Sequence, residues 1–190
     1  MKQAVYKIAT TRDEGPWILK AVLFVLSKGF QLIVRLRECL YQRGVLPRKS
    51  LPRPVISVGN LTAGGVGKTP LVEYIVQHCQ AKAKKIAVLT RGYMSGAASH
   101  AQSDEVVMLS QHLPSTPIIV GANRYEGAMQ YLAQNEVDLF VLDDGFQRMQ
   151  LKRDLDIVVL DATQPWGNGH LLPRGTLRED LSALKRAQVV

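Results

Sequence analysis

A glycine-rich loop between an apolar strand and a helix constrains the fold of this chain most. The run "RPVISVGN" predicts a buried strand, "LTAGGVGKT" predicts a loop, and "PLVEYIVQHCQAK" has helical spacing. A helix whose first N–H groups face such a loop forms an anion site. We expect Lys68 to reach the β- and γ-phosphates of a nucleotide there, and the Thr69 hydroxyl to bind Mg²⁺.

The loop departs from the common phosphate-loop pattern at one position. The spacing GxxxxGK[ST] would put its first glycine where this chain has Thr62. Gly64, Gly65 and Gly67 remain, so the backbone can still approach phosphates. We expect these three glycines and Thr62 to bind the cofactor. The "GGVGKT" loops of partition and cell-division ATPases carry a lysine where this chain has Ala63, which disfavours that class.

Two adjacent carboxylates follow a second apolar strand. Residues 137–142 predict a buried strand, and Asp143 and Asp144 stand at its C-terminal end, where open parallel sheets bind ligands. Like charges side by side disfavour each other unless a cation lies nearby. We therefore expect both aspartates to hold Mg²⁺.

Further strands and helices alternate along the chain. "KIAVLTRGY", "TPIIVGANR" and "LDIVVLDA" predict strands, the last ending at Asp161, and residues 123–135 predict a helix. Such alternation predicts a parallel, doubly wound sheet. The expected fold class is α/β, a P-loop NTPase-like, mostly parallel sheet flanked by helices and preceded by an N-terminal amphipathic helix. The expected division is a basic helical segment over 1–50 and a P-loop core over 51–190.

The positive charge is concentrated near the N-terminus. Residues 1–53 hold 11 of the 24 Lys and Arg residues but 3 of the 16 Asp and Glu residues, and so carry the whole net charge of +8. This asymmetry predicts an anionic partner, such as nucleic acid or a membrane surface. The sequence has no recognised nucleic-acid-binding module, so we expect no nucleic acid partner.

The segment that carries this charge predicts one long helix from about Trp17 to Gly44. Its uncharged runs are far short of the ~20 residues that a bilayer span needs, so we expect no crossing. The broad apolar face can lie on anionic lipid or pack against the rest of the fold, and both interpretations stay open. The polar positions fall within an arc of roughly 100°. They are Lys20, Ser27, Lys28, Gln31, Arg35, Glu38 and Gln42.

Together these pieces resemble the tetraacyldisaccharide 4'-kinases, the lipid A 4'-kinases of Gram-negative bacteria. The resemblance rests on "PVISVGNLTAGGVGKTP", "VLTRGY", "SDE", "VLDDGFQ", "LDIVVLDA" and "GNGHLLPRGTLRE", in the family's order, from about residue 15 to residue 190. A Ser or Thr at the position of Thr62 is usual in that family. Thr62 thereby helps to identify which kind of phosphate loop this is.

The resemblance implies phosphoryl transfer from ATP, with Mg²⁺, to the 4'-hydroxyl of a tetraacyldisaccharide 1-phosphate, a precursor of lipid A. It implies a monotopic enzyme on the cytoplasmic face of the inner membrane, with oligomeric state left open. By position it makes Asp104 the catalytic residue that acts on the acceptor hydroxyl, together with Lys68 and Arg178, and it places Glu179 beside Arg178 near the phosphates. A membrane-recruited P-loop NTPase switch without a lipid acceptor remains the alternative.

The chain differs from the family in three respects. The family usually has Gly-Asp-Glu-Pro where residues 103–106 read Ser-Asp-Glu-Val, and His where Arg148 stands. Family members are also considerably longer, and their C-terminal part carries a histidine that pairs with the catalytic aspartate. We therefore expect this chain to be a partial kinase that binds nucleotide and turns over poorly.

Overall fold

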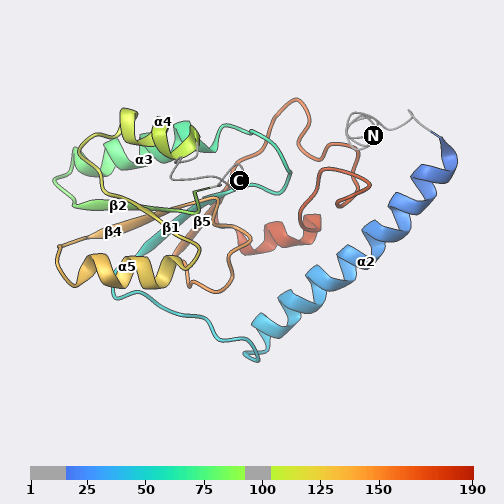
Figure 1. The fold of residues 1–190 in the computed structure, drawn as a ribbon, viewed down its shortest axis with the longest axis horizontal. Coiled ribbons are helices and arrows are strands. Elements are labelled where there is room, and N and C mark those ends of the chain that lie inside the picture. Colours follow the sequence, from blue (N-terminus) through green and yellow to red (C-terminus); the bar gives the residue numbers. More distant parts are fainter. Residues whose placement is uncertain (1–15, 93–103) are drawn as a thin grey trace, which may run out of the picture.

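The computed structural model describes residues 16–92 and 104–190, and its centre is a parallel sheet (Figure 1). Five strands lie in the order β3-β2-β4-β1-β5, and every neighbouring pair is parallel. The strands are β1 (Val55–Gly59), β2 (Ile86–Thr90), β3 (Ile118–Val120), β4 (Leu139–Asp143) and β5 (Leu155–Val158). The predicted α/β fold class is confirmed.

Helices cover both faces of this sheet, as Figure 1 shows. The helices α3 and α4 lie on one face, where apolar side chains such as Val72 and Leu109 pack against Val88. The helix α5 covers the other face, where Ala128 packs with Leu89. The helical elements are α2 (Trp17–Gln42), α3 (Lys68–Gln80), α4 (Asp104–His112), α5 (Arg124–Leu132) and the 3₁₀ helix η1 (Leu181–Arg186). The strands between the two layers are apolar because both of their faces are buried.

The register of the sheet brings the two expected phosphate-site elements together. Val58, next to the end of β1, pairs with Asp143 at the end of β4. The loop that follows β1 and the acid pair that follows β4 therefore leave the same edge of the sheet side by side, which is where open parallel sheets bind ligands. The strand predicted from "LDIVVLDA" is shorter than expected. It is β5, which ends at Val158, and Asp161 lies in the loop beyond it.

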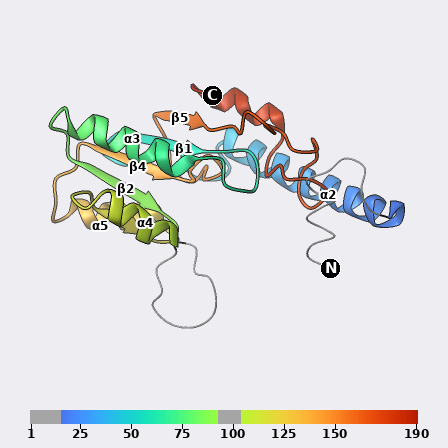
Figure 2. The ribbon, with the colours of Figure 1, turned by 90° about the horizontal axis from the view of Figure 1, so that it is seen from above.

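The helix α2 extends beyond the sheet and contacts the C-terminal part of the chain (Figures 1 and 2). Leu23 and Val34 are buried on its packed side. The Ser27 hydroxyl, also buried, donates a hydrogen bond of 2.8 Å to the Leu171 carbonyl. Phe30 packs onto a third apolar cluster, which lies around Phe146 and the residues near the C-terminus. Part of the predicted helix surface thus packs against the fold.

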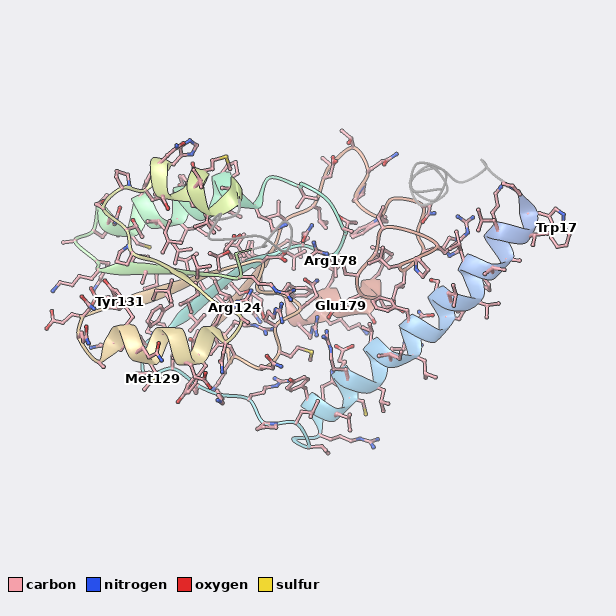
Figure 3. The ribbon with its side chains drawn as sticks, in the orientation of Figure 1. Trp17, Arg124, Met129, Tyr131, Arg178 and Glu179 are labelled. Carbon is pink, nitrogen blue, oxygen red and sulfur yellow. The ribbon has the colours of Figure 1, made fainter. Side chains whose placement is uncertain are left out.

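The opposite side of α2 is apolar and exposed. Its residues recur at helical spacing, and the tip residue Trp17 points away from the domain in Figure 3. These residues are Ile18, Val22, Val25, Leu26, Leu32, Ile33 and Leu36, each more than half exposed. One face of the helix therefore packs on the domain, as one of the two interpretations expected. The other face is apolar and exposed, and its contact with lipid stays a prediction.

By length and composition alone, α2 is long and apolar enough to cross a membrane, the one such helix within 16–92 and 104–190. The expectation that its charges exclude a crossing therefore used too strict a criterion. The contacts of α2 bear on this question: Gln31 and Arg35 each donate to Asp180 at 2.7 Å, and Ser27 donates to the Leu171 carbonyl at 2.8 Å. These polar contacts fix one side of α2 on the domain, and the absence of a crossing stays a prediction.

Candidate functional site

The glycine-rich loop joins β1 to the N-terminus of α3. Gly64 has a φ of 135° and Gly67 a φ of 81°, values that only glycine adopts without strain. Gly67 is the N-cap of the 13-residue α3, without a side-chain hydrogen bond to the first turn. The first N–H groups of α3 therefore face the loop and are available to an anion, as the sequence predicted.

The acid pair lies at the end of the neighbouring strand. Asp143 is the last residue of β4 and is 5% exposed, and the Thr90 hydroxyl from the end of β2 donates to it at 3.3 Å. Asp144 follows with a φ of 51°, a left-handed conformation that Asp adopts more readily than most residues. The turn at Asp144 directs the chain away from the sheet and leaves its side chain at the sheet edge.

One cavity of about 310 Å³ brings most of the expected residues together. Its lining combines the phosphate loop, the start of α3, the acid pair and one arginine from the C-terminal segment. The lining residues are Gly64, Gly65, Val66, Gly67, Lys68, Thr69, Asp143, Asp144 and Arg178. Residues that lie far apart in the sequence thus converge on a space with both cations and carboxylates on its walls, which is the chemistry of a phosphate and metal site.

Charged groups face one another inside this cavity. The Lys68 Nζ lies 3.5 Å from Asp144 Oδ1 and 3.3 Å from the Asn60 Oδ1. Arg178 Nη1 lies 3.0 Å from both carboxylate oxygens of Asp144. Two cations therefore share one carboxylate. Both side chains point at the space into which the glycine loop and the helix N-terminus also open.

Backbone pairing explains how Arg178 reaches the loop. The loop residue Thr62 forms an antiparallel bridge with Leu177. The Arg178 N–H donates to the Leu61 carbonyl at 2.7 Å. The chain just before the helix η1 is thereby held along the phosphate loop. Thr62 itself is 9% exposed and does not line the cavity, so its expected contact with a cofactor stays a prediction.

Asn60 is a site residue to which sequence reasoning gave no role. It is buried, and its side-chain amide donates to the Thr62 carbonyl at 2.6 Å while its oxygen accepts from Lys68. The Gln147 amide, beyond the acid pair, donates to the Asn60 backbone carbonyl at 2.7 Å. Asn60 thus ties the loop to Lys68 and to the acid-pair segment. The available signal was its place in "GNLTAGG", directly after the strand.

Two other expected residues lie differently. Asp104, the expected catalytic residue, is the first residue of α4, and its side chain is outside the part of the chain that the structure describes. Glu179 does not face the phosphate cavity: it is 2% exposed and pairs with Arg37 and Arg186. Burial raises the pKa of Glu179, and the two arginines oppose that rise. Figure 3 shows Arg178 and Glu179 as neighbours between the sheet and α2.

A second cavity, of about 510 Å³, lies between the C-terminal end of α2 and the start of α5. Tyr41, Arg124, Tyr125 and Arg148 line it. Burial, and then the positive charges of Arg148 and Arg91, lower the pKa of Arg124 to about 10. The cavity thus combines aromatic rings with cations held close together, which suits an anionic ligand that carries apolar or sugar surface.

A metal ion would need help from a ligand at this site. Among the residues that the structure describes, no group of three or more His, Cys, Asp or Glu side chains could hold a metal ion by itself. Asp143, Asp144 and Thr69 line the phosphate cavity together and offer hard oxygen atoms. That donor set fits Mg²⁺, which keeps several waters and is bound through one or two carboxylates plus substrate phosphates.

Most of the chain is similar in sequence and in structure to known proteins. Residues 19–190 match the family model described as tetraacyldisaccharide-1-P 4'-kinase. A tetraacyldisaccharide 4'-kinase of Geobacter sulfurreducens is 40% identical over 91% of this chain and 53% of that protein. One of Halothermothrix orenii is 42% identical over 88% of this chain and 48% of that protein. The chain thus spans about half the length of the curated relatives it matches. A crystal structure of LpxK from Aquifex aeolicus in complex with ATP is 34% identical, with a TM-score of 0.76 over 89% of this chain and 57% of that one.

Proposed function

Because the chain belongs to the tetraacyldisaccharide-1-P 4'-kinase family, we propose that it provides the nucleotide half of a kinase that phosphorylates the 4'-hydroxyl of a tetraacyldisaccharide 1-phosphate. The donor is ATP with Mg²⁺, and the acceptor is the lipid A precursor at a membrane surface. The observation that carries this proposal is the convergence of the glycine loop, the acid pair and Arg178 on one cavity.

The nucleotide phosphates would lie along the glycine loop. N–H groups at the start of α3 donate to the phosphate oxygens, and the Lys68 ammonium neutralises their charge. Arg178 is placed to stabilise the charge that builds on the transferred phosphoryl group, because its guanidinium already points into the same cavity. Asp143, Asp144 and Thr69 would hold Mg²⁺, which supplies further charge neutralisation on the phosphates.

The second cavity, between α2 and α5, would hold the acceptor head group. A disaccharide 1-phosphate is anionic, and Arg124 and Arg148 provide cations beside the aromatic ring of Tyr41. Leu142, which directly precedes Asp143, also lines this cavity, so the cavity adjoins the acid pair. Asp104, at the start of α4, is the residue we propose to accept the proton of the acceptor hydroxyl as the phosphoryl group arrives.

The N-terminal segment gives the chain its place at the membrane. We assign membrane association to residues 1–50 and phosphoryl transfer to residues 51–190, with no role for nucleic acid. The exposed apolar face of α2 would enter the interface while its other face stays on the domain. The net charge of +8 within residues 1–53 favours a surface of anionic lipid. Since ATP is the donor, the surface is the cytoplasmic face of the inner membrane.

The test is transfer of radiolabel from γ-labelled ATP to the tetraacyldisaccharide 1-phosphate in detergent micelles, with the 190-residue chain and with a chain extended to the length of its relatives. Labelled lipid is expected from both, more slowly from the shorter chain. Asp144→Asn should abolish labelling. Asp161→Asn is the matched control, because Asp161 is also an acid beyond a strand end but does not line the cavity and bonds to Thr163.

The outcomes separate the kinase from the alternative. ATP hydrolysis that continues at the same rate with or without the lipid, and leaves the lipid unlabelled, would favour the NTPase switch. Asp104→Ala distinguishes the two as well, because a switch has no use for a residue that takes a proton from a lipid hydroxyl. A folded, ATP-binding, extended chain that transfers no label would refute the kinase proposal.

A further inference from the structure

An ion network centred on the buried Glu179 joins α2 to the segment that carries Arg178. The Arg37 Nη2 of α2 donates to Glu179 Oε1 at 3.1 Å, and the Glu179 side chain is 3% exposed. Arg186 of η1 binds the other oxygen of Glu179 and lies 3.6 Å from Glu38 of α2. The four side chains form an open chain of alternating positive and negative charges between two helices that are distant in sequence.

The same network contacts both segments that line the phosphate cavity. Glu179 directly follows Arg178, whose guanidinium binds Asp144. Arg186 lies over the ring of Phe146 at 4.7 Å from its centroid, two residues beyond Asp144. Arg37 also donates to the Gln147 carbonyl at 3.5 Å. Arg178 is therefore next to a residue bound to α2 and η1. Asp144 lies two residues before a ring that contacts η1 and three before a carbonyl bound to α2.

The burial of Glu179 makes the network sensitive to its partners. An ionised carboxylate out of water is tolerated where cations and hydrogen bonds compensate for the lost hydration, and removal of one partner leaves an under-compensated buried charge. Without Arg37, Glu179 keeps Arg186 alone, and the carboxylate must then turn toward water or take up a proton. Because Arg178 is the preceding residue, such a rearrangement moves the backbone from which its side chain reaches Asp144.

We propose that Arg37 is a positioning residue for the phosphate site: docked on the domain, α2 holds Glu179 in place and thereby aims Arg178 at the bound phosphates. This inference rests on the proposed use of the cavity for a nucleotide, but not on the identity of the acceptor. It gives α2 a second role beside membrane association, because displacement of the helix from the domain would release Arg178 as well.

A double-mutant cycle on nucleotide affinity tests this proposal. Isothermal titration with MgATP compares the chain with Arg37→Gln, Arg178→Gln and the double variant. Each single change should weaken binding about tenfold or less, in the range typical of coupling between sites. In the Arg178→Gln background, Arg37→Gln should cost less than about twofold more, whereas independent sites give additive losses. Arg37→Lys, which keeps the charge, should restore part of the affinity.

Arg35→Gln is the matched control. Arg35 also lies on α2 and binds Asp180, the residue after Glu179, but the side chain of Asp180 is 25% exposed, whereas that of Glu179 is 3% exposed. If anchoring of α2 in general mattered, Arg35→Gln would weaken MgATP binding as much as Arg37→Gln does, and the proposal would be overturned. Additive losses in the cycle would overturn it too. Should Arg37→Gln fail to fold by circular dichroism, Arg37→Met, which also removes the charge, takes its place in the same cycle.

The acceptor does not enter this measurement. Failure to label the lipid therefore refutes the proposed kinase activity while leaving the positioning role testable by MgATP binding. A folded chain with no measurable affinity for MgATP would overturn both proposals, because neither has meaning without a nucleotide in the cavity.

Discussion

The exposed apolar face of α2 allows the strength of membrane association to be worked out. Leu32, Ile33 and Leu36 are 69%, 66% and 58% exposed. Complete burial of a Leu or Ile side chain is worth about 2 kcal/mol, so immersing the exposed part of each contributes roughly 1.3 kcal/mol. The three together contribute about 4 kcal/mol, which corresponds to nearly a thousandfold in partition coefficient.

Replacement of all three with serine should therefore lower partitioning onto vesicles by roughly 100- to 1,000-fold. The assay is co-sedimentation with vesicles of phosphatidylethanolamine and phosphatidylglycerol. Because the three side chains are exposed, the unfolding temperature in detergent-free buffer should change little. Val107→Ser with Met108→Ser, two exposed apolar residues of α4, is the control and should leave binding unchanged. A folded triple variant that binds within about threefold of the original chain would refute the assignment of this face to lipid.

The remaining predictions concern the phosphate site and the docking of α2. Lys68→Met should lower MgATP affinity at least about tenfold in calorimetry, because a charge-assisted bond to phosphate is lost, and Lys68→Arg should retain more affinity than Lys68→Met. Ser27→Ala leaves the buried Leu171 carbonyl without this donor and should cost about 1 kcal/mol in urea unfolding; unchanged stability would show that the hydrogen bond contributes nothing. The hydrogen bond from Arg35 holds the pKa of Asp180 below its ordinary value of 3.8. This stabilisation is present above the unfolded pKa and is lost as pH falls through the lower folded value, so Arg35→Gln should raise the pKa of Asp180 in an NMR titration and reduce the loss of stability below about pH 4.

The nucleotide side of the site could be predicted from sequence because its parts are local. A strand, a glycine loop and a helix follow one another, and the conformations needed at Gly64 and Gly67 leave a direct mark on the sequence. The acid pair at the end of β4 is also recognisable, since parallel strands end at one edge of the sheet. The exact ends were harder: the strand expected to end at Asp161 stops at Val158, because periodicity does not show where pairing ceases.

The contacts of the C-terminal segment could not be predicted, because they are made by an irregular chain. Arg178 and Glu179 were expected together near the phosphates, yet they face different partners. A segment without helical or strand periodicity gives no rule for which side chain faces which neighbour. The same holds for α2: a helical wheel separates its faces, but it does not say that Leu23 packs on the domain while Leu32 remains exposed.

We expect the charges around Asp144 to determine the order in which nucleotide and metal bind. Its carboxylate lies 3.5 Å from Lys68 Nζ and 3.0 Å from Arg178 Nη1, so two cations already compensate its charge. Phosphate oxygens compete for both cations with bonds of similar strength. If Lys68 and Arg178 turn to phosphate, the lone pairs of Asp144 become available beside Asp143, where we expect a divalent cation to bind. Mn²⁺ alone, measured by electron paramagnetic resonance, should therefore bind weakly, and ATP should strengthen its binding beyond the affinity of ATP itself for the metal; tight Mn²⁺ binding without ATP would contradict this order.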